Sequence, residues 1–589
     1  MSAEPENLLT EWARLVAGTL AAAGVRHVVV SPGSRSTPYL LALAARDDLR
    51  LESVLDERSA AFVALGIGRA TGAPAALLTT SGTAPAHAHP AVIEASYAEV
   101  PLLVLSADRP VELRDSGAAQ TIDQTRLFGD HARYFLELGN PSAHPEALRH
   151  ARRALLAAVA ASRGPRPGAV QINLPARKPL EPCEPSSEAG RALRARVDAL
   201  LASPPTEAVH GRGAPDVERL AARVSRAERP LVVLGPLPVS AASDGTADAV
   251  FDLARALGAP VYAEATSQLR FGRGGDGVAR VDALDLLLRV PSPLSRFDLA
   301  IEIGGPPTSM AYERLLGARP ELARIRFEAH RARDPQGTAD VAVGPIGPAI
   351  RSLLGAITEP SRVDDAWVAE VLEAERAAWA VVDESVARYG ESQIARRVIE
   401  AMPRGATLTL GNSLPIRTLD RAVPSKDLDL LVLHQRGANG IEGLVSTAAG
   451  ASIATGRPGA LLLGDLSFQH DVGGLAAAAQ VSAPLAIVVV NNDGGRIFEQ
   501  LPLGRDPRFE WIMPRVTTPQ RFAIEHAARA FGLEHARVED GEALSRALGE
   551  ALSRGGASVI EAVVPASGFR AEEASLLEAL AARVGGARP

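Results

Sequence analysis

Short apolar runs recur along the chain and alternate with longer segments in which small and apolar residues have helical spacing. Such runs are typical of strands buried on both faces, and the alternation predicts parallel sheets covered by helices. The expected strands lie at residues 28–30, 53–55, 76–79, 102–105, 170–174, 231–234, 261–263, 299–303, 407–410, 430–433, 460–463, 486–490 and 558–564. We therefore predict an α/β fold.

Two breaks interrupt this pattern. The first, 179–215, is rich in proline, serine, alanine and glutamate, and the second spans 358–365. A chain of 589 residues is also too long for a single core. We predict three α/β domains with parallel sheets, at 1–180, at 181–360 with the first break as its preceding linker, and at 361–589. The first and third domains share the same pattern of strands.

The segment 459–495 has the pattern of a strand, a helix and a second strand. The first apolar run ends at Gly464 and Asp465, and the second ends at Asn491 and Asn492. A right-handed crossover makes two such strands parallel neighbours, so both ends lie at the ligand-binding edge of the sheet. A carboxylate, a carboxamide and the carbonyls of Asp493 and Gly494 would suit Mg²⁺. The alternative is a pair of core strands that end in ordinary polar turns.

Other expected strand ends carry loops rich in glycine, serine and arginine. In the first domain they are 31–36, 56–58, 80–83 and 106–110, and in the third domain they are 411–417 and 435–441. Because parallel strands present their carboxyl ends at one edge, these loops should gather where such sheets bind ligands.

Composition removes several classes of function. The net charge of −7 gives no basic surface for nucleic acid, and no apolar run approaches the ~18 residues of a membrane span. The acidic N-terminus predicts an amphipathic helix and not a signal peptide, so we expect a cytoplasmic protein without a membrane anchor. The single cysteine, Cys183, excludes an internal disulfide, and the only lysines, Lys178 and Lys426, lie in proline-containing loops unsuited to Schiff-base chemistry.

Two motifs are interpreted as structural. Residues 272–277 formally fit G-x-G-x-x-G, but the preceding residues make a poor buried strand, so a turn is expected. His87 and His89 could in principle bind a metal, but we expect them to pack in or on a helix.

The loop sequences of the first and third domains together resemble one enzyme family, the 2-succinyl-5-enolpyruvyl-6-hydroxy-3-cyclohexene-1-carboxylate (SEPHCHC) synthases. They are SPGSRSTP, DERSAAF, TTSGTA, SADRPVELRDSGAAQTIDQ, GNSLPIR, QRGANGIEGLVSTAAG, GDLSFQHD and NNDGGRIF. The resemblance implies a thiamine-diphosphate enzyme with Mg²⁺ (or Mn²⁺) that joins 2-oxoglutarate to isochorismate and releases CO₂ in menaquinone biosynthesis. It also implies pyrimidine-binding, middle and diphosphate-binding domains, and a homodimer or homotetramer with active sites at the subunit interface.

The same resemblance assigns roles to individual residues. The metal ligands would be Asp465, Asn492 and the carbonyl oxygen of Gly494, whereas Asp493 stands where an asparagine is expected and should face solvent. Glu57 would activate the cofactor through N1′ of its pyrimidine. Without the resemblance, Glu57 would be interpreted as an acid placed favourably at a helix N-terminus. Further cofactor contacts would come from Ser413, Ile441, Gly464, Leu466, Ser467 and Ile497.

The implied substrates carry several carboxylates, which guanidinium groups bind through paired hydrogen bonds. The resemblance places four arginines in the matching loops, with catalytic and substrate-binding roles: Arg35, Arg109, Arg417 and Arg436. Ser34, Gln120 and Ser413 would accompany them, and Ile497 and Phe498 would form an apolar wall. A basic pair found in some members near 309–311 is missing here, and Arg314 is a candidate replacement.

Two alternatives remain open at this level. One is another thiamine-diphosphate carboligase, such as an acetohydroxyacid-synthase-like enzyme that acts on pyruvate, which the arginine-rich loops argue against. The other is a protein of the same fold that binds ligand without catalysis, which the presence of Glu57, Asp465 and Asn492 argues against.

Overall fold

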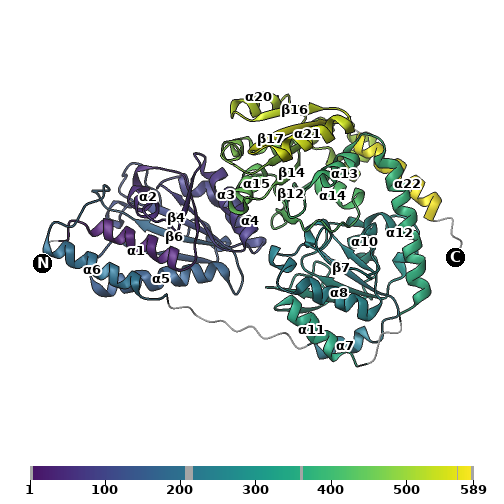
Figure 1. Ribbon diagram of the computed structural model, residues 1–589, viewed down its shortest axis with the longest axis horizontal. Helices are drawn as coiled ribbons and strands as arrows, with labels where there is room; N and C mark the ends of the chain where they lie inside the picture. The colour runs from purple at the N-terminus through teal and green to yellow at the C-terminus, as the bar shows by residue number, and fades with distance from the viewer. Residues whose placement is uncertain (1–3, 206–216, 359–362, 567, 585–589) are drawn as a thin grey trace. The chain divides into compact units, whose positions relative to one another are not determined.

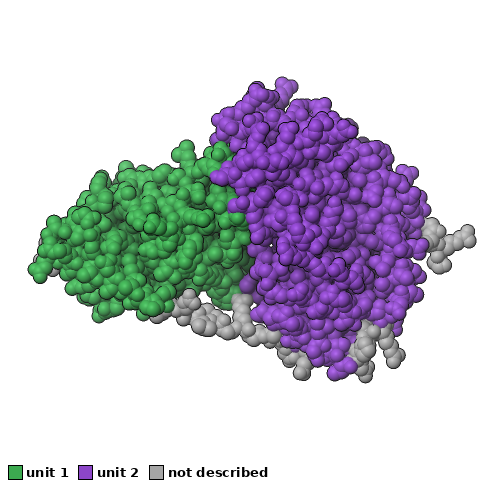
Figure 2. Space-filling model, viewed as in Figure 1, with its two compact units in different colours: residues 1–210, 435–455, 471–480 green, residues 211–434, 456–470, 481–589 purple. Residues whose placement is uncertain are grey.

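The computed structural model describes residues 4–205, 217–358, 363–566 and 568–584. It contains three parallel sheets with helices packed against them, which confirms the predicted α/β class (Figure 1). The chain divides into two compact units, coloured separately in Figure 2. The first unit comprises 1–210, 435–455 and 471–480, and the second comprises 211–434, 456–470 and 481–589. No helix of the described ranges is long and apolar enough to cross a membrane.

The first sheet has the strand order β2-β1-β3-β4-β6-β5. Its strands are β1 (His27–Val30), β2 (Arg50–Ser53), β3 (Ala75–Thr79), β4 (Leu102–Asp108), β5 (Tyr134–Glu137) and β6 (Ala169–Pro175). The central strands β3, β4 and β6 are buried at every position, as expected of strands covered on both faces. The order reverses between β1 and β3, so the loops that follow these strands flank a topological switch point.

Helices cover both faces of this sheet. They are α1 (Leu8–Ala22), α2 (Thr37–Ala44), α3 (Glu57–Thr71), α4 (His89–Tyr97), α5 (Pro145–Arg163) and α6 (Glu188–Ala202). Figure 1 shows α1, α5 and α6 together along one face, where Trp12 of α1 is buried in the core. Helix α6 lies inside the segment that we interpreted as a linker. Its buried Leu193 and Val197 belong to the same core, so apolar spacing outweighed the polar composition of that segment.

The first unit also contains α15 (Leu444–Thr455), which packs closely against α3. Glycines make this approach possible: a Cβ atom on Gly66 would overlap the carbonyl oxygen of Thr447, and one on Gly450 would overlap that of Val63. The two helix backbones therefore touch directly, and α3 is fixed relative to the segment that leads into α15.

This contact supports a stability prediction. The substitution Gly66→Ala should lower the free energy of unfolding by about 1–3 kcal/mol, because the helices must separate to admit one methyl group. Gly549→Ala is the matched control, since Gly549 lies in a helix with open space around its Cα. The control should be neutral or stabilising by up to about 1 kcal/mol, as expected for glycine replaced by alanine in an exposed helix. Urea denaturation followed by circular dichroism measures both changes, and equal stability of the two variants would contradict the prediction.

The second unit contains two sheets. The middle sheet has the order β11-β10-β9-β7-β8. Its strands are β7 (Pro230–Leu234), β8 (Val261–Ala263), β9 (Leu299–Ile303), β10 (Ala323–Glu328) and β11 (Asp340–Val343), and its helices are α7 (Glu218–Val224), α8 (Thr246–Leu257), α9 (Leu284–Leu287), α10 (Met310–Ala318) and α11 (Ile346–Ala356). The long helix α12 (Asp365–Val386) follows and packs against α22 (Gly568–Val584).

The third sheet has the order β13-β12-β14-β15-β17-β16, the same topology as the first. Its strands are β12 (Thr407–Leu410), β13 (Leu431–His434), β14 (Gly459–Gly464), β15 (Leu485–Asn491), β16 (Glu534–Val538) and β17 (Ala557–Val563). Its helices include α13 (Glu391–Ala401), α14 (Leu414–Ala422), α16 (Asp465–His470), α17 (Leu475–Ala478), α18 (Pro502–Arg505), α19 (Met513–Thr517), α20 (Ile524–Ala530) and α21 (Gly541–Ser553). Strands β14 and β15 pair in parallel from Gly459↔Leu485 to Gly464↔Val490, which confirms the predicted strand–helix–strand unit.

The sequence pattern missed four strands and misplaced one. Strands β5, β11 and β16 lie at sheet edges, where one face is exposed and the apolar signal is weak. Strand β10 is internal but carries Arg324 and Arg326, whose charges are paired with Glu302 and Glu328 inside the sheet. Edge strand β2 ends at Ser53, the residue at which the sequence pattern predicts the start of a strand.

Candidate active site

The loops that follow β1, β3 and β4 meet at the switch point of the first sheet. A Cβ atom on Gly33 would lie 2.5 Å from the Thr80 side chain, so the first two loops are in direct contact. From the third loop, Arg109 donates through Nη1 to Ser81 Oγ at 2.8 Å, and Gln120 donates through Nε2 to the Ser81 carbonyl at 3.1 Å. The structure thus brings Arg109 and Gln120 together around Ser81, a residue of the loop 80–83 to which the sequence assigns no separate role.

Arg35 belongs to the same cluster. It is only 4 % exposed, and its Nη1 donates to the carbonyl of Ala176 at 2.5 Å. Burial lowers the pKa of Arg35, the nearby guanidinium of Arg109 lowers it further, and Asp108 opposes both effects. Its Nε is buried without a hydrogen-bond partner. The guanidinium groups of Arg35 and Arg109 thus repel each other, and one of them has an unsatisfied donor. A carboxylate would neutralise the charge and accept from that donor, so the pair suits a carboxylate ligand. Ser34 lies beside them and is exposed.

Glu57 is the first residue of α3 and is half-buried. Asp56 caps this helix, since its Oδ1 accepts the amides of Arg58 at 2.9 Å and Ser59 at 3.3 Å. The cap fixes the point where the strand-to-helix turn ends, and with it the backbone position of Glu57.

The loop 435–443 carries Arg436 and Ile441 and is held within the same unit. Buried Glu94 accepts the amides of Gly437 at 3.0 Å and Ala438 at 2.6 Å, and it also pairs with Arg69 at 2.9 Å. At the other end of the loop, Gly443 has φ +68°, and a Cβ atom there would overlap the ring of Phe62 in α3. The loop is therefore seated against the helix that begins with Glu57. No sequence signal marked Glu94, because its role depends on a contact across more than three hundred residues.

The expected metal site lies in the second unit, at the ends of β14 and β15. Asp465 accepts the amide of Gly494 on Oδ2 at 2.8 Å and its neighbour Leu466 on Oδ1 at 2.8 Å. Burial raises the pKa of Asp465. Gly494 has φ +118°, and a side chain there would meet the Thr517 carbonyl, so only glycine suits this position. The structure thus brings together Asp465 and the 492–494 turn.

A buried acid that no sequence pattern marks holds Asn492. Glu391, at the start of α13, accepts Nδ2 of Asn492 at 2.8 Å. Because the amide nitrogen is committed to Glu391, the Oδ1 atom of Asn492 faces the opposite side. Burial raises the pKa of Glu391 to about 7. The carboxylate therefore orients the amide oxygen, the atom that a metal would use.

This donor set fits Mg²⁺. It consists of one carboxylate, one oriented carboxamide oxygen and the Gly494 carbonyl, which already accepts the Arg496 amide at 2.9 Å and retains a second lone pair. No cluster of three or more His, Cys, Asp or Glu side chains suited to a metal occurs within the described ranges. A site with so few protein ligands leaves coordination positions for phosphate and water, as Mg²⁺ sites for phosphorylated cofactors do.

The remaining predicted residues of the second unit lie around this edge. Ser413 follows β12, the neighbour of β14, with φ +73°, and Arg417 of α14 donates to the Ser413 carbonyl at 2.7 Å. Gly464 ends β14, and Leu466 and Ser467 lie in the first turn of α16. The ring of Phe498 and the side chain of Leu466 both lie next to Gly495, with Phe498 39 % exposed and Ile497 half-buried.

Three other expectations can be compared with the structure. Residues 272–277 form turns with positive φ at three glycines, as expected. His89 contacts the rings of Phe128 and His131, which agrees with a packing role. Asp493 is exposed and pairs with Arg496 at 3.3 Å, so it faces solvent as predicted. Arg314 lies in α10, and its proposed replacement of the missing basic pair stays a prediction.

Comparison with known proteins identifies the class to which this fold belongs. Residues 10–127 match the family model of the thiamine pyrophosphate enzyme N-terminal TPP binding domain, and residues 432–562 match that of the C-terminal TPP binding domain. The crystal structure of benzoylformate decarboxylase from Polynucleobacter necessarius superposes with a TM-score of 0.66 at 18 % identity, covering 94 % of this chain and 98 % of that one. The fold and the two matched domains define a thiamine-pyrophosphate-dependent enzyme.

Two curated relatives narrow the class. The SEPHCHC synthase of Sorangium cellulosum is 44 % identical over 95 % of this chain and 93 % of its own length. The synthase of the same name from Halobacterium salinarum is 41 % identical over 98 % of this chain and 99 % of its own length. The chain belongs to the SEPHCHC synthase family, the family that the loop sequences indicated.

Proposed function

We propose that this chain joins 2-oxoglutarate to isochorismate with loss of CO₂, using thiamine diphosphate and Mg²⁺, as a step of menaquinone biosynthesis. The observation that carries the proposal is the metal-type site at the ends of β14 and β15, where Asp465 and the turn 492–494 meet in a chain of this family. The reaction and its substrates follow from the family name and from the arginine-rich loops.

Asp465, Asn492 and the carbonyl of Gly494 would hold the metal, which in turn would hold the cofactor's diphosphate. Mn²⁺ could replace Mg²⁺, since both accept oxygen ligands. When bound, the cofactor would supply the nucleophilic carbon that decarboxylation of a 2-oxo acid and transfer of the remaining fragment require. Gly464, Leu466 and Ser467, with Ser413 and Ile497, would line the diphosphate and thiazolium part of the site.

Glu57 would hold a proton at N1′ of the pyrimidine and so favour the tautomer that activates the cofactor. Its support in the structure is the packing of Gly443 on Phe62, which seats the loop of Ile441 against the helix that Glu57 begins. Ile441 would lie under the bend of the cofactor.

The arginines would bind the substrate carboxylates. Arg35 and Arg109 would form one cationic pair with Gln120 and Ser34 beside it, and Arg417 at the start of α14 and Arg436 in the loop 435–443 would add two further guanidinium groups. Ile497 and Phe498 would exclude water behind the ring of the second substrate, which limits premature protonation.

The active assembly would be a homodimer or homotetramer in the cytoplasm, with each active site formed between two subunits. No nucleic-acid or membrane partner is proposed.

The test is a comparison of substrates with the purified protein, Mg²⁺ and thiamine diphosphate. CO₂ release should depend on 2-oxoglutarate and not on pyruvate, and with isochorismate present the product mass should equal the sum of both substrates less CO₂. Faster turnover of pyruvate would instead favour an acetohydroxyacid-synthase-like enzyme. Cofactor binding without CO₂ release from either acid would favour a non-catalytic binding protein.

A further inference from the structure

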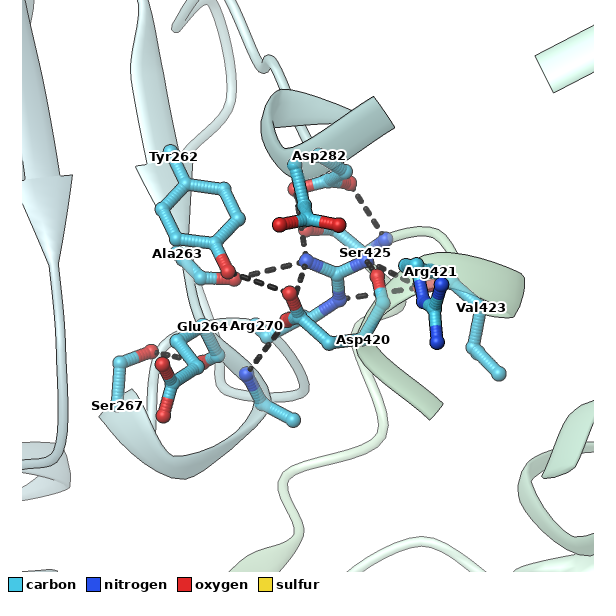
Figure 3. Close-up of polar contacts among 12 residues, drawn as sticks. Tyr262, Ala263, Glu264, Ser267, Arg270, Asp282, Asp420, Arg421, Val423 and Ser425 are labelled. Atoms are coloured by element: carbon cyan, nitrogen blue, oxygen red, sulfur yellow. Dashed lines mark hydrogen bonds and ion pairs between the residues drawn. The ribbon is translucent and has the colours of Figure 1, made fainter. Parts of the chain in front are cut away.

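A fully buried arginine joins the middle sheet to the end of α14. Arg270, which follows β8, donates through Nη2 to the carbonyl of Asp420 at 2.7 Å and through Nε to the carbonyl of Val423 at 3.0 Å. Its Nη1 donates to the carbonyl of Ala263 in β8 at 3.0 Å. The last carbonyls of a helix have no partner within the helix, and a cation favours that end. Arg270 therefore caps the C-terminus of α14 from another domain (Figure 3).

The side chain of Asp420, near the end of α14, binds residues that lie in and after β8. Its Oδ2 accepts the hydroxyl of Tyr262 in β8 at 2.5 Å, and its Oδ1 accepts the amide of Ala265 at 3.3 Å. Burial raises the pKa of Asp420 to about 7, and Arg270 opposes this shift. Figure 3 shows the carboxylate between the Tyr262 ring and the Arg270 guanidinium, so it is held on two sides.

A third point of attachment lies just past the helix. Asp282 accepts both the amide of Ser425 at 2.6 Å and its hydroxyl at 2.8 Å, and it lies 3.8 Å from Arg270 Nη1. The helix end and the residues that follow it are thus bound to the middle domain through groups that are nearly all buried. A buried, fully paired network of this kind rigidifies the elements that it joins.

The opposite end of α14 carries two of the predicted substrate contacts. The helix has 9 residues and is thus about 13 Å long. Ser413 precedes its first turn and Arg417 lies within that turn, joined by the 2.7 Å hydrogen bond from the guanidinium to the Ser413 carbonyl. A helix this short moves as a rigid rod, so its orientation at one end sets the position of Arg417 at the other.

We propose that the middle domain positions the substrate-binding end of α14, and that Tyr262 and Arg270 are the positioning residues that do so through Asp420. The inference rests on the proposed function, because it takes Ser413 and Arg417 as substrate contacts. It gives the middle domain a role in the reaction although none of the residues named here from that domain would touch the substrate.

The middle domain offers a matched control network. Tyr312 is also fully buried, and its hydroxyl donates to Glu302 at 3.1 Å, while Arg324 donates to the same carboxylate at 2.7 Å. These residues belong to α10, β9 and β10, so the network stays inside the middle domain. Loss of one hydroxyl from either network removes a similar buried hydrogen bond, but only Tyr262 bonds to α14.

The experiment compares Tyr262→Phe with Tyr312→Phe in the full-length holoenzyme. Hydrogen–deuterium exchange of peptides that cover 414–422 reports helix order directly, and the KM for 2-oxoglutarate and the Kd for thiamine diphosphate report the site. We expect faster exchange in α14 and a KM raised about tenfold only in Tyr262→Phe, because a small displacement of a binding group is enough to weaken it. The Kd for thiamine diphosphate should stay unchanged in Tyr312→Phe, and in Tyr262→Phe it should rise by less than the KM, because Ser413 is one of several proposed cofactor contacts.

Equal exchange and equal KM in the two variants would overturn the inference. Arg270→Lys repeats the test, with Arg324→Lys as its control. This pair serves as the test if a tyrosine variant does not fold. Arg417→Ala separates the inference from the proposed function: it should raise KM without changing exchange in the helix. An unchanged KM in Arg417→Ala would refute the substrate role of Arg417, whereas faster exchange in Tyr262→Phe would still support the positioning of the helix.

Discussion

Glu57→Gln is expected to reduce kcat by about 10²–10⁴-fold, the range typical of a lost acid–base group. The amide cannot share a proton with the pyrimidine nitrogen as a carboxyl group can, so exchange of the cofactor's C2 proton should slow by a similar factor. The Kd for Mg²⁺-thiamine diphosphate should change little, since the side chains remain equal in size. Exchange followed by proton NMR after acid quench, together with cofactor titration, measures both effects.

The control for this prediction is Glu52→Gln. Glu52 lies in β2, is half-exposed, and belongs to the same sheet-edge region without a proposed role. The Glu52→Gln substitution should leave both the C2 exchange rate and kcat near their original values. Near-normal C2 exchange in Glu57→Gln would show that another group activates the cofactor.

Asp465→Ala is expected to weaken metal-dependent binding of thiamine diphosphate by at least about 100-fold, because even the outer partners of metal ligands are worth 10–100-fold. The substitution removes the only carboxylate of the proposed ligand set and frees the Gly494 amide that it accepts at 2.8 Å. Isothermal titration of thiamine diphosphate at fixed Mg²⁺ measures the loss, and excess Mg²⁺ should restore part of it.

Asp493→Asn is the matched control, because Asp493 is exposed and lies beside the same turn. Its cofactor affinity should stay within about threefold of the original, the scale of a solvent-screened surface charge. If the two variants bind cofactor equally well, the metal site has been placed wrongly.

The Glu57→Gln and Asp465→Ala variants together also test the assembly. If each active site takes Glu57 from one subunit and Asp465 from another, mixed oligomers of Glu57→Gln and Asp465→Ala contain some sites with both residues intact. Co-expression of the two variants should then raise the activity above that of either variant alone. No restoration would place Glu57 and Asp465 of each site in one chain.

The strongest sequence signals were local. The apolar runs at 460–463 and 486–490, each followed by a polar residue after a strand end, correctly predicted the parallel pairing of β14 and β15 and the meeting of Asp465 with the 492–494 turn. A buried strand and the turn that ends it are formed by consecutive residues. Such a unit can therefore be inferred without knowledge of the rest of the chain. The family resemblance rested on loops of the same kind.

Contacts between distant residues were not predictable in this way. Glu94 looks like any helical glutamate, yet it holds the amides of the loop that carries Arg436. Glu391, at the start of α13, orients Asn492 in the turn after β15. Arg270 caps the C-terminus of α14, a helix that begins more than a hundred residues further along the chain. Strand β10 was missed because its charges become compatible with burial only when Glu302 is beside them.

The sequence alone determined the α/β class, the strand ends at which polar residues gather and the family to which the chain belongs, because each depends on short stretches of residues. Only the tertiary structure decided which buried acids and arginines hold those strand-end loops in place. A charged side chain is tolerated in the interior when a partner neutralises it. That partner is often distant in sequence, so only the folded structure shows which residue it is.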